Sequence, residues 1–123
     1  MTKEKKNLGK IGEDLAVSFL KKNGYKIVER NFLTRIGEID IIAKDKKVIC
    51  FIEVKTRKSL DFGVGYEAVL VSKQGKIINA AKIYLAKNNI CDTDIRFDVL
   101  SILLSDDNEI KEIEVIKGAF DSD

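Results

Sequence analysis

The segment 37–57, GEIDIIAKDKKVICFIEVKTR, decides the fold because it contains two apolar runs that are interrupted by charge. The runs 37–43 and 48–55 are rich in Ile, Val and Phe and are separated by KDKK, which predicts an antiparallel hairpin. Four charged residues lie within the two runs: Glu38, Asp40, Glu53 and Lys55. Charged side chains are seldom buried in strands without a partner, so these four require an explanation.

The length of the hairpin loop decides whether these side chains meet. A two-residue loop at Asp45 and Lys46 would pair Asp40 with Phe51 and Glu38 with Glu53. Because side chains alternate along a strand, this register predicts that all four charged residues share one face. A slip of one residue would separate Asp40 from Glu53.

The flanking sequence predicts helices and further strands around this hairpin. Apolar residues recur at helical spacing over 8–23, and Gly24 follows where a helix C-terminal cap belongs. A second helix is predicted over 72–87, with Ser72 as its cap and Ile77, Ile78, Ala81, Tyr84 and Leu85 on its buried face. Further strands are predicted over 25–32, 95–103 and 110–116, and a loop over 57–66. The order predicts an α/β sandwich with a mixed sheet.

Length and composition are those of one globular domain. The chain has 123 residues, 45% hydrophobic and 34% charged, so we expect a single domain over 1–123 with flexible ends at 1–7 and 117–123. Its apolar runs are far shorter than the roughly 18 residues that cross a bilayer, and its start, MTKEKKN, is polar. We therefore expect a cytoplasmic protein with no membrane partner. Cys50 and Cys91 show no CxxC pairing, and we expect no structural disulfide.

Charge and residue types restrict the chemistry. A net charge of +2 is too small for a protein that coats DNA, although lysines cluster around the hairpin. The chain has no His and two separated cysteines, so any catalytic metal would bind to oxygen ligands, as Mg²⁺ or Mn²⁺ does.

Three arrangements would satisfy acids that share one strand face. A divalent cation held by Asp40, Glu53 and the Val54 carbonyl would activate water, with Lys55 offsetting charge on a phosphoryl group, which is phosphodiester hydrolysis. Alternatively, Lys55 forms an ordinary salt bridge at the sheet edge, or some of the acids are solvated. Glu13 poses a similar choice, because helical spacing places it at the edge of the inward face of the first helix, where it is either a surface charge or part of the site.

The pattern formed by Asp40, Glu53 and Lys55 resembles that of the PD-(D/E)xK nuclease superfamily. The surrounding segments GKIGEDLAVSFL, ERNFLTRIGEIDIIA, FIEVKTR, KQGKI and RFDVL resemble the YraN-like family of small bacterial endonuclease-like proteins, over roughly 8–103. That family is similar in fold to archaeal Holliday-junction resolvases. The resemblance implies a restriction-endonuclease-like sandwich with a mixed central sheet flanked by helices.

The resemblance also implies roles for individual residues. It implies a Mg²⁺ or Mn²⁺ site at Asp40, Glu53 and the Val54 carbonyl, Lys55 as the catalytic lysine, and Glu13 as the helix acid that completes the constellation. Glu38 and Gln74 fall in matching segments and are placed in the second shell or at the substrate. The residues expected to bind nucleic acid are Arg57, Lys58, Lys73 and Lys76.

We therefore expect a Mg²⁺-dependent endonuclease that acts on DNA, including branched DNA. The alternative is a non-catalytic nucleic-acid-binding module with a nuclease-like fold, acting within a complex and binding without metal. A third reading is a small α/β domain that binds only protein, because fold does not determine function. Resolvases act as symmetric pairs, so the resemblance also suggests a homodimer.

Overall fold

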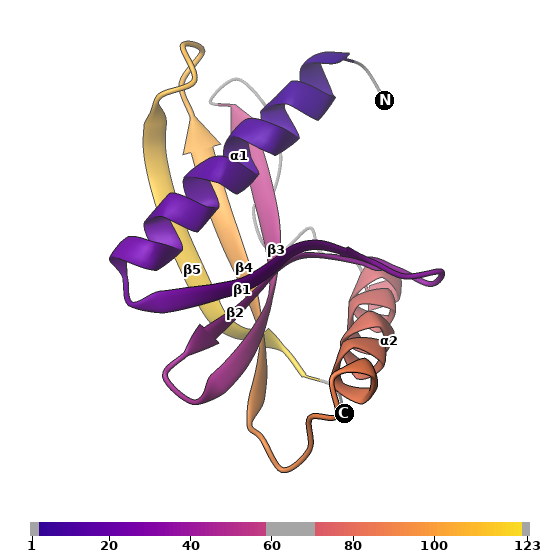
Figure 1. Ribbon diagram of the computed structural model, residues 1–123. Helices are drawn as coiled ribbons and strands as arrows, with labels where there is room; N and C mark the ends of the chain where they lie inside the picture. Colours follow the sequence, from indigo (N-terminus) through magenta and orange to yellow (C-terminus); the bar gives the residue numbers. More distant parts are fainter. Residues whose placement is uncertain (1–2, 59–70, 122–123) are drawn as a thin grey trace.

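The sheet is mixed and is covered by one helix on each face (Figure 1). This computed structural model describes residues 3–58 and 71–121, with side chains from residue 7 and, after the gap, from residue 72. The elements are α1 (Lys3–Lys22), β1 (Tyr25–Leu33), β2 (Glu38–Asp45), β3 (Val48–Lys58), α2 (Val71–Lys87), β4 (Ile95–Leu104) and β5 (Ile110–Phe120). The strands are ordered β1-β2-β3-β4-β5, with β3 and β4 parallel and the other neighbours antiparallel. The predicted α/β sandwich is confirmed.

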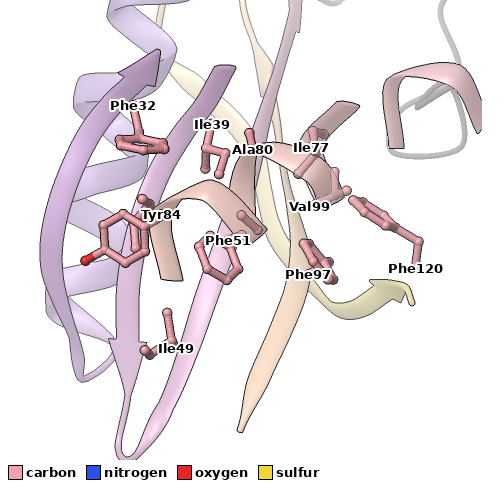
Figure 2. Close-up of a cluster of buried hydrophobic side chains, with 12 residues drawn as sticks. Phe32, Ile39, Ile49, Phe51, Ile77, Ala80, Tyr84, Phe97, Val99 and Phe120 are labelled. Carbon is pink, nitrogen blue, oxygen red and sulfur yellow. The ribbon is translucent and has the colours of Figure 1, made fainter. Parts of the chain in front are cut away.

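Each face of the sheet has its own core, as alternation in a two-sided sheet requires. The core on the α2 side includes Phe32, Phe51, Tyr84 and Phe97, and Figure 2 shows these rings gathered between the helix and the strands. The Phe32 and Tyr84 rings meet edge to face at 5.3 Å. The core on the α1 side is mainly aliphatic and consists of Ala16, Leu20, Tyr25, Ile41, Ala43, Cys50, Ile52, Leu100, Ile102 and Leu104.

Both ends of the chain are more regular than the sequence predicts. α1 begins at Lys3 and β5 continues to Phe120, although we expected flexible ends at 1–7 and 117–123. The first residues of α1, KEKKN, carry no apolar periodicity, yet Lys and Glu are good helix formers, so the helix extends beyond its apolar face. The predicted loop 57–66 is also corrected at its start, because β3 continues to Lys58, and its remainder lies outside the described residues.

The β2–β3 hairpin has a different register from the predicted one. Asp45 pairs with Val48, so the two-residue turn is Lys46–Lys47 and not Asp45–Lys46. Lys46 takes up the left-handed backbone conformation that such a turn needs, with φ of 59°. Asp45 remains in the strand because Arg96 of β4 binds its carboxylate at 3.0 Å. The predicted pairs of Asp40 with Phe51 and Glu38 with Glu53 are therefore wrong.

The corrected register keeps the two key acids on the same side of the hairpin. It differs from the prediction by two residues, and a shift of two preserves which side chains share a face. The β2–β3 pairs run from Asp45–Val48 to Ile41–Ile52. The next position in this register sets Asp40 directly opposite Glu53.

Two further findings bear on the sequence analysis. Cys50 is buried and Cys91 is exposed, and both are free cysteines in the structure. Across the residues that the structure describes, neither helix has the length and apolarity needed to span a membrane.

Candidate metal and nucleic-acid site

The site begins where β2 leaves β3. The regular pairing of these strands ends at Ile41 and Ile52, and the Asp40 carboxylate then accepts a hydrogen bond from the Val54 backbone N–H at 2.9 Å. On β2, Ile39 packs in the α2-side core and Ile41 packs in the α1-side core, so the strand turns about Asp40. An acidic side chain thus replaces the backbone partner of Val54.

Glu53 is the second acid of the site, and it is deeply buried. Its side chain is 5% exposed, and the Lys73 ammonium from the first turns of α2 lies 2.7 Å from its Oε1 atom. Glu53 also shares a hydrogen bond with Asp40. The two carboxylates of the hairpin are therefore in contact, as the sequence predicts from strand alternation.

The surroundings of Asp40 disfavour its ionisation. Burial, and next the neighbouring charge of Glu53, raise the pKa of Asp40 to about 8, although the Val54 N–H acts in the opposite direction. Two carboxyl groups in contact with little water between them favour sharing a proton over ionising together. A divalent cation bound here would favour the ionised form of both groups.

The donor set fits Mg²⁺ or Mn²⁺. Both ions prefer oxygen ligands, and Mg²⁺ is commonly held by one or two carboxylates, with water and substrate phosphate completing its shell. A strand residue directs its N–H and its carbonyl toward the same neighbouring strand. The Val54 carbonyl therefore points to the same side of β3 as the Val54 N–H, which is the side of Asp40, where β2 no longer pairs with β3. Within residues 3–58 and 71–121, Asp, Glu and Cys side chains do not gather in groups of three at metal-binding distance. Among the described residues, the Val54 backbone oxygen is therefore a candidate for the third ligand.

Lys55 lies two residues beyond Glu53 on β3 and is half-buried. Burial, and next the positive charge of Lys73, lower the pKa of Lys55, while Glu53 and Asp40 act in the opposite direction. For Lys73, burial also lowers the pKa, but the hydrogen bond and charge of Glu53 outweigh it and leave the pKa raised. The structure therefore places two ammonium groups beside two acids, and one of these ammonium groups comes from α2.

Glu13 approaches this group from the opposite helix. A Cβ atom added at the preceding Gly12 would lie 1.8 Å from Thr56 Oγ1, so only glycine allows α1 to lie this close to β3. Burial raises the pKa of Glu13, while a hydrogen bond from Asn31 and the charge of Arg30 lower it. Arg30 lies 3.7 Å from Glu13, and the charge of Glu13 in turn raises the pKa of Asp40. Glu13 is therefore a partly buried acid at the margin of the pair.

The remaining predicted residues lie on β2, β3 and α2, the elements that carry the pair and Lys73. Glu38 is exposed and lies opposite Leu33 of β1. On α2, Gln74 is half-buried and Lys76 is exposed. Arg57 and Lys58 are half-buried at the end of β3. The ammonium of Lys58 lies 3.5 Å from the Asp106 carbonyl oxygen.

Two features of the site were missed by sequence reasoning. Lys73 was assigned to a DNA-binding surface, whereas the structure pairs it with Glu53 across the face of the sheet. Arg30 and Asn31 of β1 were not assigned any role, yet both contact Glu13. The residue type of Asn31 gave a weak indication of an irregular backbone, because Asn tolerates the left-handed conformation that it adopts here, with φ of 52°.

Comparison with known proteins identifies the family. The model of the family described as "Uncharacterised protein family UPF0102" matches residues 12–102. The chain belongs to the UPF0102 family. The UPF0102 protein of Acetivibrio thermocellus is 52% identical over 120 residues, which cover 94% of this chain and 92% of that relative. The UPF0102 protein of Clostridium perfringens is 49% identical, with 98% of each chain covered. That of Dictyoglomus turgidum is 44% identical over 94% of this chain and 98% of the relative.

UPF0102 is the YraN-like group that the sequence motifs indicated, so that resemblance is confirmed. The matched segment 12–102 includes the acids of the pair, Lys55 and Lys73, and also Glu13. The whole candidate site therefore lies within the part of the chain that defines UPF0102 membership.

Proposed function

We propose that this UPF0102 protein is a Mg²⁺- or Mn²⁺-dependent endonuclease that hydrolyses phosphodiester bonds in DNA. The observation that supports the proposal is the contact of half-buried Asp40 with buried Glu53 at the point where β2 leaves β3, with two lysines beside it. Two acids in contact that resist ionising together are unfavourable for stability, and such a cluster is typical of a functional site.

In this proposal the two carboxylates and the Val54 carbonyl hold the cation. The cation, when bound, supplies charge that lowers the pKa of water and neutralises phosphate oxygens. Lys55 lies on the same strand face and offers an ammonium to offset charge on the phosphoryl group. The Lys73 ammonium lies 2.7 Å from Glu53 and is its ion-pair partner in the metal-free protein.

The resemblance to resolvase-like nucleases supports branched DNA as the substrate and a homodimer as the active form. Light scattering or sedimentation of the purified protein tests the dimer directly. The choice between Mg²⁺ and Mn²⁺ is made by comparing cleavage rates with each ion.

A second function has its own supporting observation. The Lys73 ammonium and the Val54 N–H already provide Glu53 and Asp40 with partners in the absence of metal. A binding module with a nuclease-like fold would use this arrangement as a structural ion pair, and its DNA affinity would depend on salt and not on metal.

The experiment that separates these functions is a cleavage assay on end-labelled single-stranded, duplex, flap and four-way-junction DNA. The proteins are wild type, Asp40→Ala, Glu53→Ala and, as a matched acid, Glu112→Ala, which is exposed on β5. We expect cleavage by wild type and Glu112→Ala with Mg²⁺ or Mn²⁺, and a loss of about 10²-fold or more in the other two. Titration of Mn²⁺ by calorimetry gives an independent readout, because both site variants should bind the ion more weakly.

Cleavage at the wild-type rate by Asp40→Ala and Glu53→Ala would refute the assignment of the site. DNA binding that is unaffected by metal, without cleavage of any of these DNAs, would favour the binding module instead.

A further inference from the structure

The turn between β1 and β2 presents an unusual pair of apolar side chains to solvent. We call residues 33–37 the hairpin tip. Leu33 is 76% exposed and Ile36 is 46% exposed, and both belong to this tip. Isolated exposed apolar residues are normal on protein surfaces, but two on one protruding turn indicate a surface that contacts something.

The hairpin tip is held in a fixed shape by its own hydrogen bonds. The Thr34 hydroxyl donates to the Gly37 carbonyl at 2.8 Å and accepts from the backbone N–H groups of Ile36 and Gly37. The Thr34 backbone N–H also donates to the Gly37 carbonyl at 2.9 Å. The backbone that carries Leu33 and Ile36 is therefore held in place before any partner binds.

The hairpin tip is also supported from below by α2. A Cβ atom added at Gly37 would lie 2.9 Å from the Lys76 carbonyl oxygen, so the tip and the helix backbone are in close contact. Figure 1 shows the β1–β2 hairpin extending past the rest of the sheet and over one end of α2. The tip is a braced protrusion next to the helix that contributes Lys73 to the site.

The charge of the hairpin tip favours a polyanion over a protein as its partner. Arg35 lies between the two apolar side chains, is exposed, and forms no ion pair with the residues that the structure describes. Lys76, against which the tip packs, is exposed as well. The segment 33–37 has no acidic residue, and the exposed Glu38 that follows it lies opposite Leu33. Apolar side chains flanked by cations suit contact with bases and with the phosphates beside them.

The hairpin tip lies at a defined distance from the candidate site. Leu33 pairs with Glu38, which is two residues from Asp40 along β2, and Ile36 is four residues from Asp40. At about 3.3 Å per residue, Leu33 is roughly 7 Å from Asp40 along the strand, and Ile36 lies beyond the end of β2. Stacked nucleotides are spaced about 3.4 Å apart, so Leu33 would reach a base about two nucleotides from a phosphate held at the site.

We propose that the hairpin tip is a wedge that binds unstacked bases where the DNA stack is interrupted, as at a branch point. Leu33 and Ile36 insert at the interruption, and Arg35 and Lys76 contact the adjacent phosphates. An intact duplex would have to be unstacked before the wedge could enter, so it binds less well. This inference rests on the proposed function for its choice of DNA as partner, and it adds the element that selects the DNA structure.

The first test uses the absence of tryptophan from the sequence. Leu33→Trp introduces a single fluorescent reporter at the tip, and Ile110→Trp introduces one at the start of β5, where the native residue is 45% exposed. The proteins are titrated in EDTA with a four-way junction and with a duplex of matched sequence. We expect the junction to quench Leu33→Trp by about twofold or more, through stacking on bases, and to leave Ile110→Trp unchanged. Equal signals from the two reporters would overturn the proposal.

The second test removes the wedge. Leu33→Ala combined with Ile36→Ala should weaken junction binding in EDTA about tenfold and leave duplex binding unchanged, while Ile110→Ala behaves as wild type. Thermal unfolding confirms that each variant is folded. Junction binding by the double variant at wild-type affinity would overturn the proposal and would fit a tip that contacts protein instead.

Binding in EDTA keeps this test separate from the proposed catalysis. A wild-type protein that does not cleave but shows the quenching and the tenfold loss would refute the nuclease and support the wedge. A wild-type protein that cleaves, while the double variant binds and cleaves junctions as well as wild type, would support the nuclease and overturn the wedge. Where cleavage occurs, cuts at a constant distance of a few nucleotides from the branch point support the proposal, and cuts at scattered positions contradict it.

Discussion

Replacing Asp40 by Asn should change how the stability of the metal-free protein depends on pH. Asn has the same shape and can still accept the hydrogen bond from the Val54 N–H, but it cannot ionise. In the wild type, burial and the charge of Glu53 raise the pKa of Asp40 from 3.8 to about 8. The folded protein therefore keeps a proton on this group at pH values where the unfolded chain has lost it.

The sign and size of the effect follow from proton linkage. Because the folded pKa is raised, the stabilisation is fully present below about pH 4 and is lost as the pH rises toward about 8. Between these limits the free energy of unfolding should fall by about 1.4 kcal/mol per pH unit from this group alone. From pH 5 to pH 7 the wild type should therefore lose about 2–3 kcal/mol relative to Asp40→Asn.

The assay is urea denaturation in EDTA, followed by circular dichroism at several pH values between 5 and 7. The control is Asp106→Asn, which removes an exposed carboxyl group from the β4–β5 turn and should retain the wild-type pH dependence. Parallel stability curves for wild type and Asp40→Asn would refute the reasoning, because they would mean that Asp40 titrates alike in the folded and unfolded states. Mg²⁺ should stabilise wild type more at pH 8 than at pH 5, since the ion competes with the proton.

Three further substitutions test contacts that hold the site and the fold. Lys73→Met leaves the buried Glu53 side chain without its ion-pair partner, so it should lower the free energy of unfolding in EDTA by roughly 1–3 kcal/mol. Mg²⁺ should restore part of this loss. Unchanged stability in urea titrations would contradict the prediction. Gly12→Ala places a Cβ atom against Thr56, so it should destabilise the protein by about 1–2 kcal/mol, although Ala has the better helix propensity. Adding Thr56→Ala should restore the stability. A wild-type melting temperature for Gly12→Ala alone would count against this prediction. Asp98→Ala removes a fully buried carboxylate that binds an arginine of the same strand, so chemical denaturation should show a free energy of unfolding lower by about 3–5 kcal/mol. A decrease below about 1 kcal/mol would show that the buried ion pair contributes little.

The helices and strands were predictable because apolar residues recur every three or four positions in the helices and at strand spacing in the strands. The predicted helix 72–87 corresponds to α2, and its predicted inward residues Ile77, Ala81 and Tyr84 are buried. The register of the β2–β3 hairpin was not predictable from local sequence. It depends on the contact of Asp45 with Arg96, two residues that are 51 positions apart. The four residues Lys44 to Lys47 do not reveal a turn position that depends on the guanidinium of a residue far along the chain.

The contact of Asp40 with Glu53 was predictable even though the predicted register of the β2–β3 hairpin was wrong. Alternation brings these residues to the same face for any even displacement of the strands, and the actual displacement differs from the predicted one by two residues. The contact of Lys73 with Glu53 required the position of α2 over the sheet, which no period in the sequence encodes. The same holds for Arg30 at Glu13, because it depends on how α1 crosses β1.

The hydrogen bond from the Val54 amide to Asp40 has a consequence for observing the protein in solution. Most strand amides are protected from solvent exchange by a carbonyl of the next strand, whereas this one is protected by a side chain. Its exchange rate and nitrogen chemical shift should therefore respond when the Asp40 carboxylate changes its charge or acquires another partner. A single backbone signal in the spectrum of ¹⁵N-labelled protein would then report the occupancy of the site, without a substrate or a reaction.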